Sequence, residues 1–325
     1  MTPAFDVVCV GEALVDFLPD KAGQRVRDVQ GWIPCSGGSP ANVAVGLARL
    51  GARSAMLGVV GQDELGHFLV ERLAAEGVDV SHLRQTDEGK TGLVFISLTA
   101  TGERSFSFYR TRSAELFLAR RDLEAAFLAS ARVIHLGTNS LLFPEARAAV
   151  LGVAKDARAA GRIVSSDPNL RLHMWPDPGE LKALLGQLLP CCAVVKLSEE
   201  EIEFVTGQRE PEAALAELAK WGVPLPIVTL AERGALFRWN GQVVHAPAPS
   251  AQVVDSTGAG DGFVSGLLYG VTRRYADLAE LQHASAEGLR ELVTFGCAVG
   301  ARVVEKLGAV AGLPRRDEVQ ALLPR

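Results

Sequence analysis

Apolar residues in the first 90 positions alternate between short continuous runs and segments with helical spacing. The run Phe5–Val10 ends at a glycine, which is typical of a buried β-strand. Residues 39–50 place apolar side chains at helical spacing, with a proline near the start, where a helix tolerates it. A strand pattern at 54–60 and a helix pattern at 64–76 follow. This region therefore predicts strands and helices in alternation.

The same alternation returns in the second half of the chain. Strands are predicted at 133–137, 163–167, 193–198 and 226–230, and helices at 145–160, 179–189, 199–205, 260–274 and 284–306. Residues 235–247 have the pattern of a hairpin. Strands that alternate with helices of this length indicate an α/β fold, with a mostly parallel central sheet and helices on both faces.

Two segments interrupt this rhythm and are predicted to form a separate small sheet. Residues 12–36 mix short alternating stretches with glycine, proline and charge. The segments 91–98 and 104–109 are strand-like and are joined by the turn sequence ATGE, which indicates a hairpin. We expect a small antiparallel β lid, inserted from about 12–36 and 90–113.

Composition and charge restrict the kinds of partner. The length of 325 residues suits a single domain over 1–325 that contains the lid. The net charge of −5 predicts neither a nucleic-acid partner nor an anionic membrane surface. Five cysteines show no zinc spacing and are interpreted as reduced thiols, which favours a cytoplasmic location. No signal peptide or membrane span is recognised near the start or elsewhere.

The stretch VVDSTGAGDGFVSGLL, at 253–268, combines a small-residue turn with a carboxylate. Gly258, Ala259 and Gly260 precede an apolar helix, whose first N–H groups can bind phosphate oxygens. Asp261 would oppose simple anion binding, but it suits phosphoryl transfer if it takes a proton from an attacking hydroxyl. The alternative is a helix cap worth about 1 kcal/mol. The nearby Asp255 and two hydroxyl residues favour the catalytic interpretation.

Two long motifs in chain order carry a family resemblance. GGSPANVAVGLARLG at 37–51 and DSTGAGD at 255–261 resemble the two signatures of the PfkB (ribokinase-like) carbohydrate kinases. GGSPAN, the FYR stretch and DPNLR followed by Trp175 are most similar to fructokinases within that family. The resemblance implies a ribokinase-like fold and ATP-dependent phosphorylation of a primary hydroxyl, of D-fructose to D-fructose 6-phosphate.

The resemblance also implies roles for individual residues. Asp261 would be the catalytic base, with Gly258, Ala259 and Gly260 at the phosphoryl group. The sugar would be bound by Asp16, Gly37, Gly38, Asn42, Arg110 and Arg171. The nucleotide would be bound by Lys196, Thr229, Ala231, Gly234, Thr257 and Cys297, along the carboxyl ends of the sheet near the reversal of its strand order. Glu201 would hold Mg²⁺ through water, and Asp255 with the loop 307–311 would form a K⁺ site.

Several of these residues have a plain structural alternative. Asp16 could be an exposed edge residue, and Arg110 and Arg171 could be solvated surface arginines. Ala231 and Cys297 differ from the glycine and asparagine that relatives often carry, so we expect a restricted turn and an altered contact with adenine.

Three other functions stay open at this point. A 2-keto-3-deoxygluconate kinase would use the two arginines for an acidic sugar, and a ribokinase would act on a pentose. A non-catalytic sugar sensor with the same fold is the third. The open edges of the lid also predict a homodimer formed through it.

Overall fold

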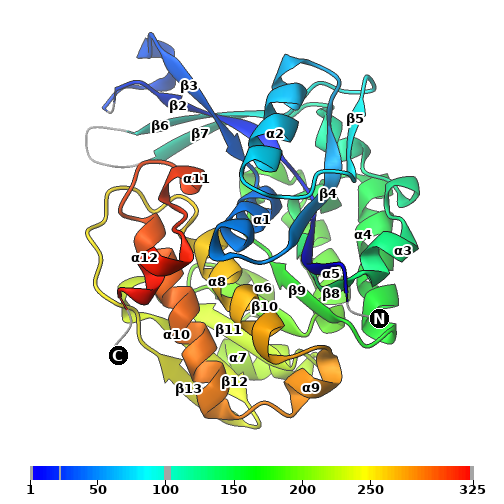
Figure 1. Ribbon diagram of the computed structural model, residues 1–325, viewed down its shortest axis with the longest axis vertical. Coiled ribbons are helices and arrows are strands. Elements are labelled where there is room, and N and C mark those ends of the chain that lie inside the picture. Colours follow the sequence, from blue (N-terminus) through cyan, green and yellow to red (C-terminus); the bar gives the residue numbers. More distant parts are fainter. Residues whose placement is uncertain (1–2, 22, 99–103, 323–325) are drawn as a thin grey trace.

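A computed structural model describes residues 3–21, 23–98 and 104–322 of the chain. Within these residues, a nine-stranded sheet runs through the molecule in the order β13-β12-β11-β10-β9-β8-β1-β4-β5 (Figure 1). Its strands are β1 (Phe5–Val10), β4 (Ser54–Gly61), β5 (Leu83–Thr86), β8 (Ala131–Gly137), β9 (Ile163–Asp167), β10 (Val194–Ser198), β11 (Leu225–Thr229), β12 (Ala235–Trp239) and β13 (Gln242–Ala246). All neighbouring pairs from β5 to β11 are parallel, and β12 and β13 add an antiparallel hairpin. The predicted mostly parallel sheet is confirmed.

Helices cover both faces of this sheet, as predicted (Figure 1). One face carries α1 (Ser39–Leu50), α2 (Glu64–Ala75), α8 (Ala259–Arg274) and α10 (Ala286–Val303). The other carries α3 (Ala125–Ala129), α4 (Pro144–Ala159), α5 (Pro178–Leu188), α6 (Ile202–Thr206) and α7 (Pro211–Lys220). Three short helices complete the chain: α9 (Leu278–Gln282), α11 (Ala309–Gly312) and α12 (Arg316–Gln320). No helix in the described part of the chain is long and apolar enough to cross a membrane.

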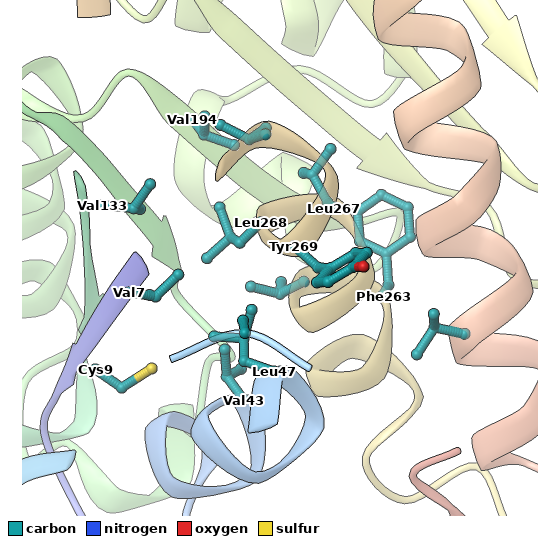
Figure 2. Packing of buried hydrophobic residues seen from close by; sticks show 14 of the residues in the cluster. Val7, Cys9, Val43, Leu47, Val133, Val194, Phe263, Leu267, Leu268 and Tyr269 are labelled. Carbon is teal, nitrogen blue, oxygen red and sulfur yellow. The ribbon is translucent and has the colours of Figure 1, made fainter. Parts of the chain in front are cut away.

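The core has two layers because the central strands are buried on both faces. Val7 and Cys9 of β1 pack toward α1 and α8, whereas Val8 and Val10 pack toward the opposite helices. Figure 2 shows the first of these layers, in which side chains of β1, β8 and β10 meet those of α1 and α8. Burial on both faces explains why these strands have continuous apolar runs and no alternation.

The small sheet has the strand order β3-β2-β6-β7 and projects from the end of the molecule that also carries α2 (Figure 1). Its strands are β2 (Leu14–Pro19), β3 (Trp32–Gly37), β6 (Leu93–Leu98) and β7 (Arg104–Tyr109). The two outer pairs are antiparallel, as expected of a lid built from hairpins. The central pair β2–β6 is parallel and joins the two hairpins into one sheet. The predicted turn ATGE lies outside the described residues.

Helix α8 lies against α10 along a row of three glycines. A Cβ atom on any of them would lie only 2.6–2.7 Å from a side chain of α10; the three are Gly262, Gly266 and Gly270. Their spacing of four residues places all three on one stripe of the helix. Nearly every residue of α8 beyond its first turn is buried, so this row fixes a helix that passes through the interior.

Candidate active site

Two cavities meet at the carboxyl ends of the parallel strands. The first, here called the lid cavity, has a volume of about 300 Å³ and lies between the small sheet and the ends of β9 and β10. The second, here called the helix cavity, measures about 510 Å³ and lies between the segment after β11 and helices α8 and α10. Ser256 and Gly260 line both cavities. The amino end of α8 is therefore the point at which contents of the two cavities would meet.

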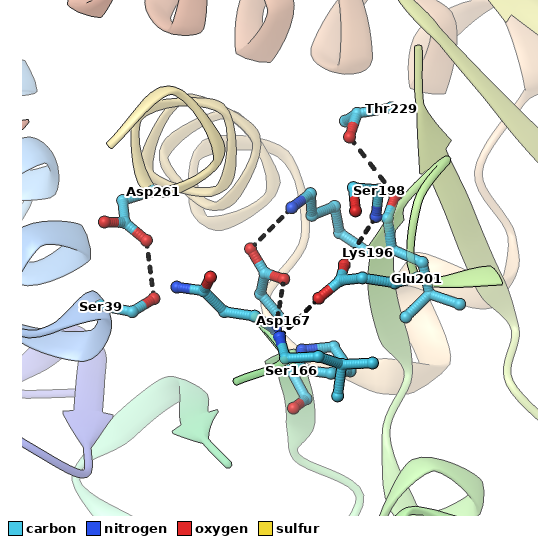
Figure 3. Close-up of polar contacts among 12 residues, drawn as sticks. Ser39, Ser166, Asp167, Lys196, Ser198, Glu201, Thr229 and Asp261 are labelled. Atoms are coloured by element: carbon cyan, nitrogen blue, oxygen red, sulfur yellow. Dashed lines mark hydrogen bonds and ion pairs between the residues drawn. The ribbon is translucent and has the colours of Figure 1, made fainter. Parts of the chain in front are cut away.

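Asp261 lies in the first turn of α8, behind Gly258, whose left-handed φ of +79° glycine adopts without strain. Its carboxylate accepts hydrogen bonds from Ser39 Oγ at 2.6 Å and Asn42 Nδ2 at 2.8 Å, both on α1. The Asp261–Ser39 contact is drawn in Figure 3. These partners belong to another helix, and no side chain of the described residues caps α8, so the capping alternative is wrong. Burial raises the pKa of Asp261, although both hydrogen bonds and nearby cations oppose the shift.

Asp16 lies on β2, an inner strand of the small sheet, and lines the lid cavity. The exposed-edge alternative is therefore wrong. Burial, together with the negative charge of Asp261, raises the pKa of Asp16 to about 7. A Cβ atom on Gly37 would collide with the Asp16 carboxylate, and one on Gly38 would lie 2.5 Å from the Glu12 carbonyl oxygen. Both glycines are thus required by the close approach of β2 to the start of α1.

A buried ion pair forms the far wall of the lid cavity. Lys196 Nζ lies 3.0 Å from Asp167 Oδ2, with side chains 8% and 2% exposed (Figure 3). Burial raises the pKa of Asp167 to about 6, against the attraction of Lys196. Burial alone would lower the pKa of Lys196, but the charges of Asp167, Glu201 and Asp261 raise it. A Cβ on Gly260 would be 3.0 Å from Lys196 Nζ, so this cation lies beside the start of α8.

Glu201 connects the end of β10 with the loop after β9. Its carboxylate accepts hydrogen bonds from the backbone N–H groups of Leu170, at 2.6 Å, and Ser198, at 2.8 Å (Figure 3). Arg171 lines the same cavity, half-buried, and donates to Asn169 Oδ1 at 2.8 Å. Its side chain is held by its own loop and does not extend freely into solvent, so the surface alternative is wrong for Arg171.

Arg110 is buried, which also excludes the surface alternative for this residue. Its Nε donates to Glu115 Oε1 at 2.7 Å, and its side chain lines the lid cavity. Asn42 has a comparable position, since its Oδ1 is buried and has no hydrogen-bond partner among the described residues. Both residues therefore have unused hydrogen-bonding capacity next to the cavity.

The helix cavity is mainly apolar and has few polar groups. Thr229, Ala231, Gly234, Phe263 and Cys297 contribute to its lining. Ala231 has a φ of +51°, a left-handed conformation that strains a residue with a Cβ atom. Glycine would adopt this conformation without strain, and the predicted restriction of the turn by Ala231 stays a prediction. Such a lining is typical of a small-molecule site.

Two residues predicted to bind the nucleotide line the lid cavity. Lys196 and Thr257 lie near the start of α8, where this cavity meets the helix cavity. Lys196 pairs with Asp167, and Thr257 donates to Asp255 Oδ1 through its N–H, at 2.9 Å. The strand order reverses between β1 and β8, whereas the helix cavity lies at the end of β11. The helix cavity therefore lies away from the reversal, and the place of the nucleotide near that reversal stays a prediction.

Asp255 holds the loop 307–311 in place. Its Oδ2 accepts a hydrogen bond from the Gly308 N–H at 2.7 Å, while Oδ1 accepts from Thr257. The loop 307–311 is thereby joined to the turn that precedes α8. This brings together the two segments expected to form a monovalent-cation site.

Two residues of the site were not predicted as functional. Ser39 donates to Asp261, and Asp167 pairs with Lys196. Both lie in motifs already noted, GGSPAN and DPNLR, and Asp167 ends a buried strand where its carboxylate reaches the functional edge of the sheet.

The chain matches a family model, and it is similar to proteins of known name and structure. The model of the pfkB family carbohydrate kinases matches residues 4–316. The chain is 37% identical to fructokinase-2 of Solanum habrochaites, over 98% of this chain and 95% of the relative. Fructokinase from Xylella fastidiosa with bound ATP superposes with a TM-score of 0.89 at 34% identity, covering 98% of this chain and 97% of that one.

A double mutant of fructokinase from Vibrio cholerae O395, in a form with fructose, ADP and potassium, superposes with a TM-score of 0.88 at 34% identity. The superposition covers 100% of both chains. With the family model spanning almost the whole sequence, and with both signature segments meeting at Asp261, the chain belongs to the pfkB family of carbohydrate kinases.

Proposed function

We propose that this protein transfers the γ-phosphoryl group of ATP to the primary 6-hydroxyl of D-fructose. The observation that carries the proposal is the position of Asp261, held by Ser39 and Asn42 at the junction of two cavities. A sugar in the lid cavity and a nucleotide in the helix cavity would place acceptor and donor on either side of Gly260. The fructokinase relatives support fructose as the sugar.

Asp261 acts as the general base. Two neutral donors hold its carboxylate in one orientation, and its raised pKa makes it a better proton acceptor than an exposed aspartate. The attacking hydroxyl gives its proton to this carboxylate as its oxygen bonds to the γ-phosphorus, and the bond from that phosphorus to the bridging oxygen breaks, so that ADP leaves. The N–H groups of the 258–261 turn and the Lys196 ammonium stabilise the charge on the transferred group.

The sugar is bound by groups with unused hydrogen-bonding capacity. The Asp16 carboxylate accepts from two hydroxyls once it is ionised, and Asn42 Oδ1 accepts from another. Gly37 and Gly38 leave the space that a side chain would fill. Arg110 and Arg171 line the same cavity and donate to ring or hydroxyl oxygens.

The nucleotide base occupies the apolar helix cavity. Cys297 and Phe263 contact adenine by van der Waals packing, and Thr229, Ala231 and Gly234 form the turn beside it. Ala259 and Gly260 then lie along the path toward the phosphates, where the absence of long side chains allows close approach.

Magnesium fits the acidic edge of the lid cavity. Asp167 and Glu201 supply carboxylate oxygens there, but the described residues contain no cluster of three or more His, Cys, Asp or Glu side chains that could enclose an ion. Mg²⁺ characteristically keeps several waters and uses one or two carboxylates with substrate phosphates. When bound, it would neutralise phosphate charge. Glu201 would hold it through water, since both oxygens of this carboxylate already accept backbone hydrogen bonds.

Potassium is proposed at the loop 307–311 beside Asp255. The potassium-bound form of a relative supports the use of this ion, and the contact between Asp255 and Gly308 supports its place. Turnover in KCl should exceed turnover in NaCl at equal ionic strength, and equal rates in the two salts would contradict a potassium site.

An aromatic row and the open edge strands of the small sheet support a homodimer formed through the lid, and the free cysteines support a cytoplasmic location. Phe17, Trp32 and Tyr109 surround Phe95 at centroid distances of 4.9, 4.9 and 5.3 Å, and Tyr109 is 62% exposed. A second copy would cover this aromatic row and the edge strands. Sedimentation should give a dimer for the wild type and a monomer for Tyr109→Lys. The five free cysteines fit a reducing compartment.

Substrate comparison tests the proposal. We expect kcat/KM with ATP to be highest for D-fructose, compared with D-ribose and 2-keto-3-deoxygluconate, and the product to be D-fructose 6-phosphate. Preference for either of the other sugars would identify one of the alternative kinases. Absence of sugar-dependent ATP consumption with all three would favour the sugar sensor.

A further inference from the structure

A buried cluster of charges supports one wall of the lid cavity. The side chains of Arg110 and Glu115 are 4% and 1% exposed, and Ser113 Oγ donates to the same carboxylate oxygen as Arg110 Nε, at 2.5 Å. Arg110 Nη1 contacts Met174 Sδ at 3.8 Å, while Nη2 is buried and has no partner among the described residues. Arg110 therefore uses Nε in the ion pair with Glu115, while Nη2, unpaired within the described residues, is a free donor in a side chain that lines the cavity.

A second carboxylate lies close to this pair. Glu12 is buried, accepts a hydrogen bond from Asn139 Nδ2 at 3.0 Å, and has one oxygen without a partner in the described part of the chain. Burial raises the pKa of Glu12, the positive charge of Arg110 opposes that shift, and the negative charge of Glu115 adds to it. Arg110 thus has two acidic neighbours, of which Glu115 is its direct ion-pair partner.

The ion pair decides what the unused donor can recognise. An unpaired buried guanidinium would attract a ligand carboxylate, because burial without a counter-ion is very unfavourable for a charge. Glu115 already provides that counter-ion, so the Arg110–Glu115 pair has little net charge while Arg110 Nη2 still offers a hydrogen-bond donor. Such a donor suits a hydroxyl or ring oxygen. The other cations that line the cavity also have acidic neighbours. Lys196 pairs with Asp167. The charge of Arg171 acts on Asp16 and Asp261 and opposes the rise in their pKa.

We propose that Glu115 is a positioning residue that sets substrate specificity: by neutralising Arg110 it makes the lid cavity select neutral ketoses over sugar acids. The proposal rests on the proposed function, since it assumes that the sugar occupies the lid cavity. It also explains how an arginine that would suit an acidic sugar can serve a neutral one.

Glu115→Gln tests this directly, because it removes the charge and keeps the size of the side chain. Dissociation constants are measured by calorimetry for D-fructose and for 2-keto-3-deoxygluconate. We expect the sugar acid to bind at least tenfold more tightly to the variant, while the constant for fructose changes less than threefold. Glu115→Asp retains the charge and should keep the wild-type ratio. Glu291→Gln removes an acidic partner of an exposed arginine elsewhere and is the matched control.

Two further variants keep the test decisive. If Glu12 replaces Glu115 as counter-ion, the ratio should change only when Glu12→Gln is added to Glu115→Gln. Gly92→Ala places a methyl group 2.8 Å from both Glu115 carboxylate oxygens, and so displaces this residue without deleting it. It should move the ratio in the same direction.

The proposal would be overturned if the folded double variant, Glu115→Gln with Glu12→Gln, kept the wild-type ratio of the two dissociation constants. Its failure can be distinguished from failure of the proposed function. A wild-type enzyme that prefers another neutral sugar contradicts fructose as substrate. The charged-to-neutral ratio, measured with that sugar in place of fructose, still tests Glu115.

Discussion

Replacing Asp261 by asparagine removes the proposed base and changes the shape of the site very little. The amide keeps one oxygen that can accept from Ser39 Oγ or from Asn42 Nδ2, which are 2.6 and 2.8 Å from the native carboxylate. Asn42 keeps its own orientation in this arrangement, so its Oδ1 stays available to the sugar. We therefore expect the variant to fold, with a loss of at most about 1–3 kcal/mol from an imperfect hydrogen bond.

The expected effect on turnover is much larger than the effect on stability. General-base catalysis typically contributes about 10²–10⁴-fold to a rate. At 1.36 kcal/mol per factor of ten, this loss corresponds to about 2.7–5.4 kcal/mol of transition-state stabilisation. The sugar should still bind within about threefold of its wild-type affinity, because Asp16, Arg110 and Arg171 are unchanged.

The assay couples ADP formation to NADH oxidation under saturating ATP and fructose, and calorimetry gives the affinity for fructose. Asp317→Asn, at an exposed position on α12, is the matched control and should retain full turnover. A kcat for Asp261→Asn within fivefold of the wild type, in a preparation with the native circular dichroism spectrum, would refute the assignment of Asp261 as the base.

Three further changes probe the fold and the cavity wall. Asp16 has a folded pKa of about 7 against an ordinary 3.8, so its favourable contribution to stability is complete below about pH 4 and is lost as pH rises to about 7. Asp16→Asn should therefore make the free energy of unfolding, measured in urea, less dependent on pH across that interval. An unchanged dependence on pH would contradict the shift. The same ionisation should raise wild-type kcat/KM for fructose as pH increases through about 7, and Asp16→Asn should lose this rise. Lys196→Met leaves the Asp167 carboxyl without its cation, so the loss of stability, at most about 3–5 kcal/mol, should be larger at pH 8 than at pH 6; a loss independent of pH would argue against the ion pair. Leu47→Ala in the layer between α1 and the sheet should cost about 2–5 kcal/mol in urea unfolding with little change in KM, and a cost below 1 kcal/mol would mean that the site is not closely packed.

The regular elements could be predicted wherever burial imposes a simple pattern. The strand β1 and the helix α1 agree with their predicted ranges because β1 is buried on both faces and α1 on almost every position. Helix α7 was not predicted, although Pro211 at its start and the alanines that follow are helix signals. Strand β5 (Leu83–Thr86) is polar in the middle and lies at the edge of the sheet, so local sequence gives it little signal.

Long-range contacts mark the limit of prediction from the sequence. The parallel pairing of β2 with β6 joins segments about 80 residues apart, and no local pattern specifies it. In the site, the motif around Asp261 indicates its chemistry, but its hydrogen-bond partner Ser39 is 222 positions away. Glu115 shows no sequence signal, because an acidic residue after a lid strand resembles any surface charge until the fold buries it against Arg110.

The row of glycines between α8 and α10 has a consequence for how accurately the enzyme can aim its base. Gly262, Gly266 and Gly270 let the two helix backbones touch, so α8 has no room to slide or rotate. The position of Asp261 is therefore fixed by contacts up to about 14 Å further along the same helix. A methyl group at Gly270 would push α8 away from α10 and tilt the helix, which would displace Asp261 relative to the hydroxyl that it deprotonates. Substitutions of these glycines should therefore lower turnover before they unfold the protein, because they displace the base from the reacting hydroxyl.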